Sequence, residues 1–429
     1  MTCHRGWENS FQYSENKNCN FPPMQKWMVS MMLLWLILLS GLSKAQETIS
    51  LVSYNLLNYE GIQADTAIRN PYFRKIMQAL QPDLLVCEEV KAYQGILGFV
   101  AHVMNDSADI YSLGTFITGF DTNKALIYRK EKFHFISNHA IKTDLRDINE
   151  FKVVHKASGD TLRLYAVHLK ASSSNDDEAQ RASEVDSLRK RTNALPVGTD
   201  FIVCGDFNIY NTNEDAYQKL MQNNATDDGH VVDPILISGV FNNPSYAKYH
   251  TQSPRVRNFG GGVVGGLDDR FDMILFSNAV MEQGGISYIP GSTISFGNDG
   301  NHYNDSINRP PNTAVGDEMA DALHAASDHL PLISLLEFQT TGIPDFAKES
   351  VNVEVFPNPF SDVLQMKISP QPVAPIHFEL YDVLGRIIAT EDFMASAVIT
   401  YHMPALMPGI YLYRMHWGQL FASGTIVRN

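Results

Sequence analysis

The stretch FIVCGDFNIYN, residues 201–211, decides how we interpret this chain. Its apolar run at 201–204 is closed by Gly205, which is typical of a strand in the core of a sheet. Asp206 and Asn208 follow directly and, being two residues apart, point to the same side. A carboxylate and a carboxamide at one edge of a sheet suit a hydrated divalent cation and a phosphate oxygen. The alternative is an Asx turn that only closes the strand.

Other predicted strands between residues 46 and 340 also carry polar side chains at one end. Such residues recur too regularly to be explained by packing, and they are natural for a site built along one edge of a sheet. They are Asn55 after TISLVSY, Glu88 and Glu89 after LLVC, His168 in LRLYAVHL, Asp272 in FDMILF, and Asp328 and His329 before the last strand of this region.

Helical patterns separate some of these strands. We expect an amphipathic helix that ends at Gln81-Pro82-Asp83, and a second helix over about 177–195 that contains Arg181. Strands and helices mix without strict alternation, which favours a mixed sheet or a two-sheet α/β sandwich. Two long loops, the glycine-rich 258–269 and 297–325, are expected to shape access to the site.

The start of the chain predicts export. Residues 1–23 are polar and form an N-terminal extension of uncertain status. Residues 24–45 have a charged start, a short apolar run and small residues near Ala45, which is typical of a signal peptide. The run is short for a membrane span, so a single-pass anchor is the alternative, and we expect no stable span in the mature protein. Cys87 and Cys204 are expected to be core thiols.

The net charge of −14 lies on residues 46–350, because the segments before and after this region cancel each other. An acidic body argues against tight nonspecific binding to nucleic acid. It does not exclude a metal-dependent enzyme that acts on phosphate, since bound cations invert the local charge.

The motifs of residues 46–340 resemble the endonuclease/exonuclease/phosphatase superfamily, the DNase-I-like phosphoesterases. The similar pieces, in the family's order, are SYNLLNY, QPDLLVCEEV, YAVHLKAS, VCGDFN, RFDMILF and ASDHLPL. The resemblance implies a four-layer α/β/β/α sandwich and a metal-dependent phosphoester hydrolase.

The resemblance also implies roles for the strand-end residues. The metal, Mg²⁺ with Mn²⁺ or Ca²⁺ as alternatives, would be held by Asn55, Glu89 and Asp328. The family usually has Gln before the metal-binding Glu, so a slip of one residue would assign Glu88 in place of Glu89. The remaining roles are a water-orienting base or proton donor for Asp206, a phosphate donor for Asn208, a base or phosphate clamp for His329 held by Asp272, a phosphate contact or acid for His168, and a phosphate contact for Arg181.

The last 79 residues form a separate region. After a linker at 341–350, short strands with Gly and Pro turns indicate a small β-sandwich over 351–429. Its motifs VFPNPF, LYDVLGR, MPGIYLYR and GTIVRN resemble the C-terminal sorting domain of the type IX secretion system. The resemblance implies a Bacteroidetes-type bacterium, recognition by the type IX machinery, and a secreted or cell-surface protein. A carbohydrate-binding or adhesive module is the alternative.

These features lead to three functional hypotheses. The first is a secreted nuclease, a monomer that hydrolyses extracellular DNA or RNA; the aromatic and basic residues of 241–262 favour it mildly. The second keeps the chemistry but takes lipid or small phosphate esters, as sphingomyelinase-like enzymes do. The third is a non-catalytic surface-binding protein on the same fold.

Overall fold

The structure is a computed structural model, and it describes residues 45–224, 226–282, 284–340, 352–369, 371–372, 374–382, 386–403, 406–417 and 420–429. The expected extension, the signal peptide up to residue 44 and the linker lie outside these residues. Within the described ranges, no helix combines the length and the apolar character that crossing a membrane requires.

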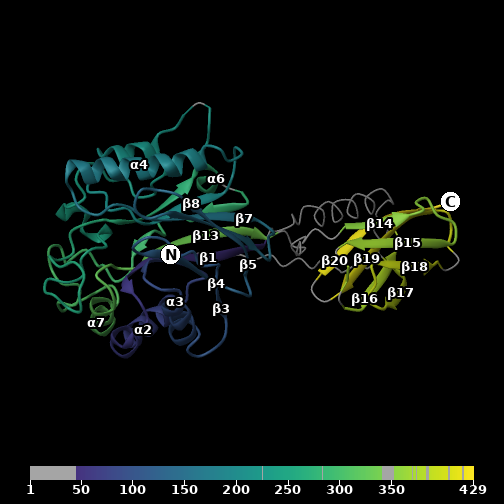
Figure 1. The fold of residues 1–429 in the computed structure, drawn as a ribbon, viewed down its shortest axis with the longest axis horizontal. Coiled ribbons are helices and arrows are strands. Elements are labelled where there is room, and N and C mark those ends of the chain that lie inside the picture. The colour runs from purple at the N-terminus through teal and green to yellow at the C-terminus, as the bar shows by residue number, and fades with distance from the viewer. Residues whose placement is uncertain are drawn as a thin grey trace, which may run out of the picture. The chain divides into compact units, whose positions relative to one another are not determined.

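Residues 45–340 build two mixed sheets (Figure 1). In sheet A, β1 lies in the middle, antiparallel to β13 and parallel to β2. The order of sheet A is β11 (Ile286–Tyr288), β13 (Leu332–Thr340), β1 (Ala45–Tyr59), β2 (Leu84–Val90), β4 (Asn123–Arg129) and β3 (Tyr111–Leu113), with β12 (Ile294–Ser295) also on β13. The order of sheet B is β5 (Phe133–Ile141), β6 (Ile148–His155), β7 (Thr161–His168), β8 (Phe201–Asp206), β10 (Asp272–Ser277) and β9 (Val231–Val232).

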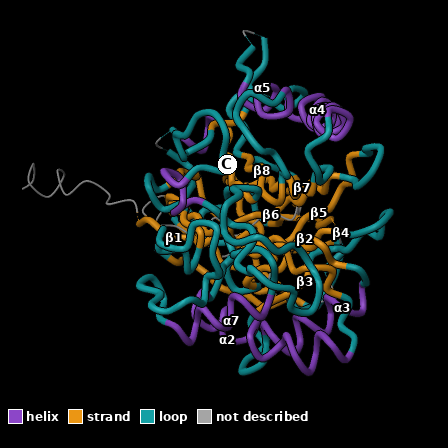
Figure 2. Tube along the Cα trace, turned by 90° about the vertical axis from the view of Figure 1, so that its left-hand side faces the viewer, coloured by secondary structure: helices purple, strands orange, loops and turns teal. Residues whose placement is uncertain are grey.

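Helices cover the outer face of each sheet. Figure 2 shows α4 and α5 on one side of the strands and α2, α3 and α7 on the other. The helices and helical turns are η1 (Ala64–Arg69), α2 (Asn70–Leu80), α3 (Tyr93–Phe99), η2 (Val100–Met104), α4 (Asn175–Thr192), α5 (Asp215–Met221), η3 (Pro244–Tyr249), α6 (Asn278–Met281) and α7 (Asp317–Ala326).

The alternation of side chains along each strand creates the layers. Leu51 and Leu84 of sheet A pack with Leu164 and Ile202 of sheet B between the two sheets. Val52 and its equivalents on the opposite face of sheet A pack against α2, α3 and α7. Since successive side chains of a strand point to opposite faces, one apolar run serves two cores. The expected four-layer α/β/β/α sandwich is therefore confirmed.

Helix α4 shows how local sequence sets the boundaries. Ser174 and Asp177 form a reciprocal capping box at its first turn. Three acidic residues follow in that turn and three basic residues occupy the last turn, which complements the helix dipole. One expectation was wrong here: the long loop predicted over 297–325 contains most of α7, whose Ala320 and Leu323 are buried.

The C-terminal region forms two antiparallel sheets around a single core that includes Phe378, Tyr401 and Met415. This agrees with the expected small β-sandwich. One sheet contains β14 (Asn352–Phe356), β15 (Val363–Ser369) and β18 (Val398–His402), and the other contains β17 (Ile387–Phe393), β16 (Ile376–Tyr381), β19 (Gly409–Trp417) and β20 (Leu420–Arg428).

Candidate active site

The site lies where the apolar layer between the two sheets ends. On the strand faces that point into this layer, apolar residues are followed at the same periodicity by polar ones. The series are Leu51, Ser53 and Asn55 on β1; Leu84, Val86 and Glu88 on β2; Leu164, Ala166 and His168 on β7; Ile202, Cys204 and Asp206 on β8; and Phe276, Ile274 and Asp272 on β10.

Strand register places three of these residues side by side in sheet B. His168 is the partner of Asp206 in the parallel pair β7–β8. Asp272 is the partner of Asp206 in the antiparallel pair β10–β8. Neighbouring strands lie about 4.8 Å apart, so His168, Asp206 and Asp272 form a row across the edge of the sheet.

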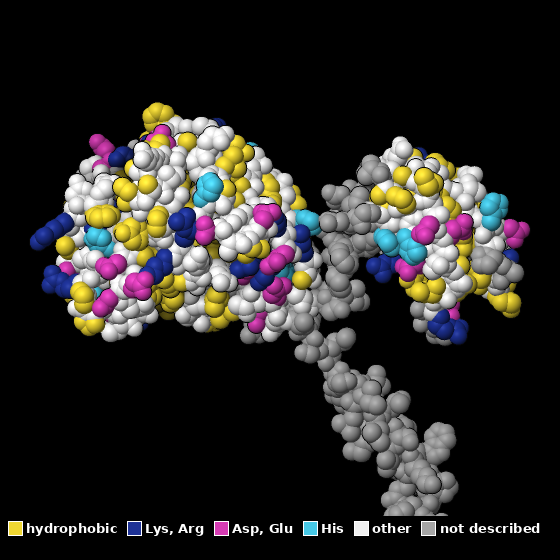
Figure 3. All heavy atoms as spheres, turned by 90° about the horizontal axis from the view of Figure 1, so that it is seen from below, with side chains coloured by type: hydrophobic (Ala, Val, Ile, Leu, Met, Phe, Trp, Pro, Cys, Tyr) yellow, Lys and Arg dark blue, Asp and Glu magenta, His cyan; other side chains and the backbone are white. Residues whose placement is uncertain are grey.

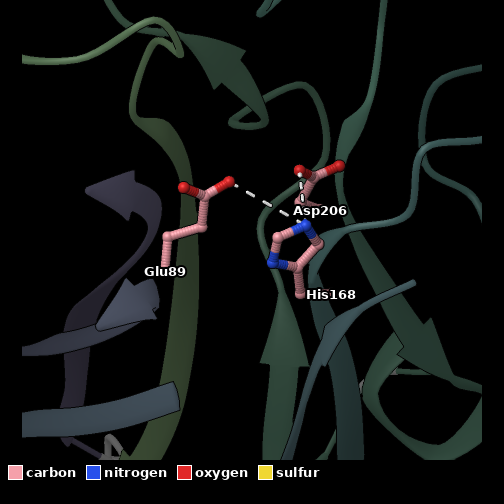
Figure 4. A group of neighbouring side chains, drawn as sticks. All are labelled: Glu89, His168 and Asp206. Atoms are coloured by element: carbon pink, nitrogen blue, oxygen red, sulfur yellow. Dashed lines mark ion pairs between the residues drawn. The ribbon is translucent and has the colours of Figure 1, made fainter. Parts of the chain in front are cut away.

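Glu89 of sheet A faces this row from the opposite sheet (Figure 4). His168 Nε2 lies 3.6 Å from Asp206 Oδ2 and 3.9 Å from Glu89 Oε1. Across the described part of the chain, these three residues are the one group of His, Cys, Asp and Glu whose ligand atoms all lie within 4.8 Å of one another. Two carboxylates and an imidazole at this spacing fit a divalent cation.

Asn55 links the two sheets at the same point. Its side chain is buried, and its amide nitrogen donates to Glu89 Oε1 at 3.0 Å and to Asp206 Oδ2 at 3.2 Å. Its carbonyl oxygen accepts from the backbone N–H of Leu57 at 2.9 Å. The structure thus brings Asn55 to the candidate cation position, but with the amide nitrogen, rather than the oxygen, turned toward the carboxylates.

Glu88 and Glu89 are directed differently because the strand is irregular between Cys87 and Val90. Glu89 adopts a left-handed φ of 54° and turns toward Asn55 and His168. Glu88 points between the sheets, where Ser53 donates to it at 3.1 Å. Burial, and then Asp272, raise the pKa of Glu88 well above its ordinary value, which disfavours the charged form that a cation ligand needs. The geometry favours Glu89 as the ligand.

Both ring nitrogens of His329 have neighbouring polar side chains. Its Nδ1 lies 2.7 Å from Asp272 Oδ2, and its Nε2 lies 2.6 Å from the amide nitrogen of Gln252 and 3.7 Å from Asp206 Oδ2. Burial opposes the charged ring, but Asp272 and Asp206 outweigh it and raise the pKa of His329 well above its ordinary value. The expected arrangement of Asp272 behind His329 is present.

Burial shifts the pKa values of Asp206 and His168 in opposite directions. Burial raises the pKa of Asp206 to about 7, a shift that Asp272 and Glu89 reinforce and the charge of His329 opposes. Burial, followed by Arg146 and Lys124, lowers the pKa of His168 well below its ordinary value. His168 is therefore a neutral imidazole near pH 7.

Asn208 lies beside the cluster but is turned away from it. Its backbone N–H donates to Asp206 Oδ1 at 3.1 Å, and its side-chain nitrogen donates to the carbonyl of Leu169 at 3.3 Å. The residue has a left-handed φ of 50° and fixes the turn that follows β8. The predicted donation to phosphate stays a prediction.

Asp328 is placed apart from the cluster. Its Oδ2 accepts from the backbone N–H of Val263 in the glycine-rich loop at 2.6 Å, and its buried Oδ1 has no hydrogen-bond partner. An orphaned carboxylate oxygen of this kind is what a cation would satisfy. In this structure Asp328 connects the loop to the edge of sheet A, and the shared site with Asn55 and Glu89 stays a prediction.

Arg181 does not reach the site, and the phosphate contact expected of it is not supported. Its guanidinium is fully buried and donates twice to Glu214, at 2.9 and 2.8 Å. It also donates to the carbonyls of Lys170 and Ser172 at 2.9 and 2.6 Å. Arg181 thus ties the segment after His168 to the segment after Asn208.

Sequence reasoning missed several polar residues around the site. Gln252 contacts His329, and its position in a loop without a motif gave no signal. Arg146 donates to the carbonyl of Leu169 at 3.2 Å. Lys124 is buried, and its burial lowers its pKa to about 7. Lys124, next to the apolar residues of β4, is the one signal in the sequence that could have indicated buried polar side chains near the site.

Comparison with protein families identifies one region of the chain. Residues 354–428 match the family model of the secretion system C-terminal sorting domain, which confirms the resemblance of this region. A search of the curated proteins finds no match.

A search of the solved structures also finds similar chain traces. TDP2 from D. rerio, in complex with a single-stranded DNA product, has a TM-score of 0.45 and 14% identity over 68% of this chain and 99% of that chain. An endonuclease/exonuclease/phosphatase family protein from Bacteroides thetaiotaomicron has a TM-score of 0.42 and 15% identity, over 68% and 99%. A mannosyl-6-phosphatase from the same species has a TM-score of 0.41 and 16% identity, over 67% and 99%. The second of these belongs to the family that the sequence motifs resemble.

Proposed function

We propose that this protein is a secreted, divalent-cation-dependent phosphoester hydrolase. The observation that carries the proposal is the meeting of Glu89, His168 and Asp206 next to the buried Asp272–His329 pair. Five chemically active side chains from two sheets converge at one edge, and packing alone does not call for such a group.

The cation, Mg²⁺ with Mn²⁺ or Ca²⁺ as alternatives, would be held by Glu89 and Asp206, with Asn55 and Asp328 as further oxygen donors. When bound, such a cation neutralises phosphate charge and lowers the pKa of a coordinated water. The unpartnered Oδ1 of Asp328 and the close approach of the carboxylates to His168 support the fit.

The residues of the chain would divide the remaining work. Asp206, whose pKa is raised to about 7, is suited to exchange a proton with a water molecule near neutral pH. Asp272 fixes the His329 ring through Nδ1 and raises its pKa, so His329 is suited to take up a proton at Nε2 and then to present positive charge toward the phosphate. His168 is neutral near pH 7, which favours a phosphate contact or a ligand nitrogen over the expected role as an acid.

Nucleic acid is the first polymeric substrate to test, as the sequence predicted. Two observations weaken that choice. Arg255, which favoured it in the sequence, is buried and donates to backbone carbonyls. On the face drawn in Figure 3, Lys and Arg are interspersed with Asp and Glu and form no continuous basic stripe. Esters of less polar alcohols are therefore the second candidate substrate class.

The test is hydrolysis by the purified full-length chain. We expect bis(p-nitrophenyl) phosphate to be cleaved with Mg²⁺ or Mn²⁺, and cleavage to stop when EDTA is added. Asp206→Ala should lower the rate by about 100-fold or more, while the fold, followed by circular dichroism, stays intact. Full activity of Asp206→Ala, or of the EDTA-treated protein, would rule out the proposed mechanism. Plasmid DNA and RNA tested in parallel separate a nuclease from other phosphodiesterases.

Export through the type IX system belongs to the same proposal, and the match at 354–428 supports it. Removal of residues 351–429 should leave the protein inside the cells of a type IX host, while the full chain appears in the medium or at the surface. Equal export of both forms would contradict the proposal. Cleavage of a signal peptide after Ala45 can be checked by N-terminal sequencing of the exported protein.

A further inference from the structure

A cavity of about 270 Å³ opens between η1 and the glycine-rich loop. Apart from Ala325 of α7, it is formed by two segments that lie almost 200 residues apart in the sequence. One is the end of β1 with η1, and the other is the loop around residues 255–262. Its apolar lining consists of Leu57, Ile62, Ile68, Phe259 and Ala325.

Two residues of the cavity wall, Asn58 and Gly262, lie next to the candidate cation ligands Glu89 and Asp328. The backbone N–H of Asn58 on one wall donates to Glu89 Oε2 at 2.9 Å. Val263, which follows the lining residue Gly262, donates its backbone N–H to Asp328 Oδ2 at 2.6 Å. Next to it, Gly262 has a φ of +84°, and a Cβ there would lie 2.6 Å from Asp328 Oδ2. Only glycine allows this close approach, so the cavity wall at Gly262 lies directly against the carboxylate of Asp328.

Two arginines line the cavity, and most of their guanidinium N–H groups already donate hydrogen bonds within the protein. Arg255 donates to the carbonyls of His324, Phe259, Gly261 and Ala325 at distances of 2.6 to 3.2 Å. Arg69 donates to the carbonyls of Leu56, Leu57 and Ala326 and to Asp65. These bonds engage four of the five N–H groups of each guanidinium, so the two arginines brace the walls and neither offers a pair of donors to a phosphate or a nucleobase.

Apolar side chains around the cavity remain exposed. Ile62 is 53% exposed, Ile68 is 54% exposed and Phe259 is 40% exposed. Single exposed apolar residues are common on protein surfaces. Here three of them line one cavity next to a polar site, and such a grouping is typical of a surface that a ligand covers.

We propose that this cavity is the subsite that binds the apolar alcohol group of the phosphoester substrate. The inference rests on the proposed function, because the phosphate would lie at the neighbouring carboxylates. It deepens that function by naming the substrate class: phosphoesters of an alkyl alcohol, rather than nucleic acid.

A series of p-nitrophenyl alkyl phosphate diesters, from methyl to octyl, tests the subsite. In each turnover water adds to phosphorus, the bond to the aryl oxygen breaks, and p-nitrophenolate, an alkyl phosphate and a proton are released. Each methylene that enters the cavity should raise kcat/KM by about fourfold, until the chain outgrows the cavity.

Two variants and one control sharpen the test. Ile68→Ser and Phe259→Ser should flatten the dependence on chain length and leave hydrolysis of the methyl ester unchanged. Val197→Ser is the matched control: Val197 is 81% exposed, and it precedes β8 at the end opposite Asp206. This variant should keep the full dependence on chain length.

Calorimetry with alkylphosphonates, which are not hydrolysed, measures binding to the cavity and does not depend on turnover. Affinity that rises with chain length in the wild type, and stays flat in Phe259→Ser, would support the subsite even if no diester were cleaved. No cleavage of the methyl ester with any of the three cations would instead contradict the proposed function. A flat series in both experiments, or rapid cleavage of DNA together with a flat series, would overturn the inference.

Discussion

His329 Nδ1 lies 2.7 Å from Asp272 Oδ2, and both side chains are buried. The two residues come from different sheets, because Asp272 starts β10 of sheet B while His329 leads into β13 of sheet A. This contact therefore joins the sheets at the edge where the candidate site lies. It also fixes the ring so that Nε2 faces Asp206, at 3.7 Å.

Asp272→Asn should remove most of the activity while the protein stays folded. The Asp272 carboxylate is the largest of the contributions that raise the pKa of His329 against burial, so the pKa of His329 should fall in the variant. We expect kcat/KM to fall by about 100-fold or more. The pH dependence of kcat/KM and the His329 NMR signal report the change. An unchanged pH profile would show that Asp272 does not set the charge of His329.

Glu88 and Glu89 can be separated by a matched pair of variants. Glu89→Gln removes a carboxylate charge from the candidate cation position, so Mn²⁺ affinity should fall by about tenfold or more. Glu88→Gln changes a side chain that contacts Ser53 between the sheets and not the candidate cation position, so Mn²⁺ affinity should change little. Electron paramagnetic resonance titration with Mn²⁺ measures both. The reverse order would identify Glu88 as the ligand.

The Arg181–Glu214 pair should contribute to stability through the loops that it joins. Arg181→Met leaves the buried Glu214 carboxylate without its partner, and we expect the free energy of unfolding to fall by about 3–5 kcal/mol. The double variant Arg181→Met/Glu214→Gln should lose less than the single variant, because no buried charge remains. Urea unfolding measures both. Wild-type stability of Arg181→Met would contradict the role assigned to this pair.

Asp200 should make stability depend on pH. Burial, reinforced by Asp160, raises the pKa of Asp200 to about 6 from an ordinary value of 3.8. The folded protein therefore holds this proton more tightly, and the associated stability is complete below about pH 4 and is lost as the pH rises through 6.

Asp200→Asn should remove this loss. We compare the free energy of unfolding of the variant with that of the wild type at each pH. Allowing for partial solvent exposure, this difference should favour the variant by about 1–2 kcal/mol more at pH 7.5 than at pH 4. Thermal unfolding at the two pH values measures the difference, and Asp144→Asn, a change at an exposed loop carboxylate, is the control. Equal pH dependence of wild type and Asp200→Asn would contradict the pKa of Asp200.

The strand-end residues could be predicted because alternation along a strand is a local property of the sequence. Asn55, His168 and Asp206 each continue an apolar series that faces the other sheet, and the structure brings them together. The orientation of Glu89 could not be predicted in this way, because it depends on one left-handed backbone position. The burial of Arg181 was missed since its partner Glu214 is remote in sequence.

Some parts of the fold lacked a local signal altogether. Strands β5 and β6 were not predicted: β5 is largely exposed, and both depend on pairing with each other and with β7. Helix α7 follows a polar, proline-containing stretch, which hid the short apolar face of Ala320 and Leu323. In each case the deciding contacts come from distant segments, and sequence periodicity does not report them.

Because β1 pairs with β13, residues 45–340 can complete their fold only after β13 has been synthesised. Ala45 is the partner of Thr340, so the central strand of sheet A meets its neighbour only after nearly 300 further residues have been made. Until then the edge of β1 that pairs with β13 has no neighbouring strand, and sheet A is incomplete beside the site. A ribosome-bound chain that ends before residue 329 therefore lacks His329, and the candidate site is complete only when the segment leading into the final strand of the body has been made.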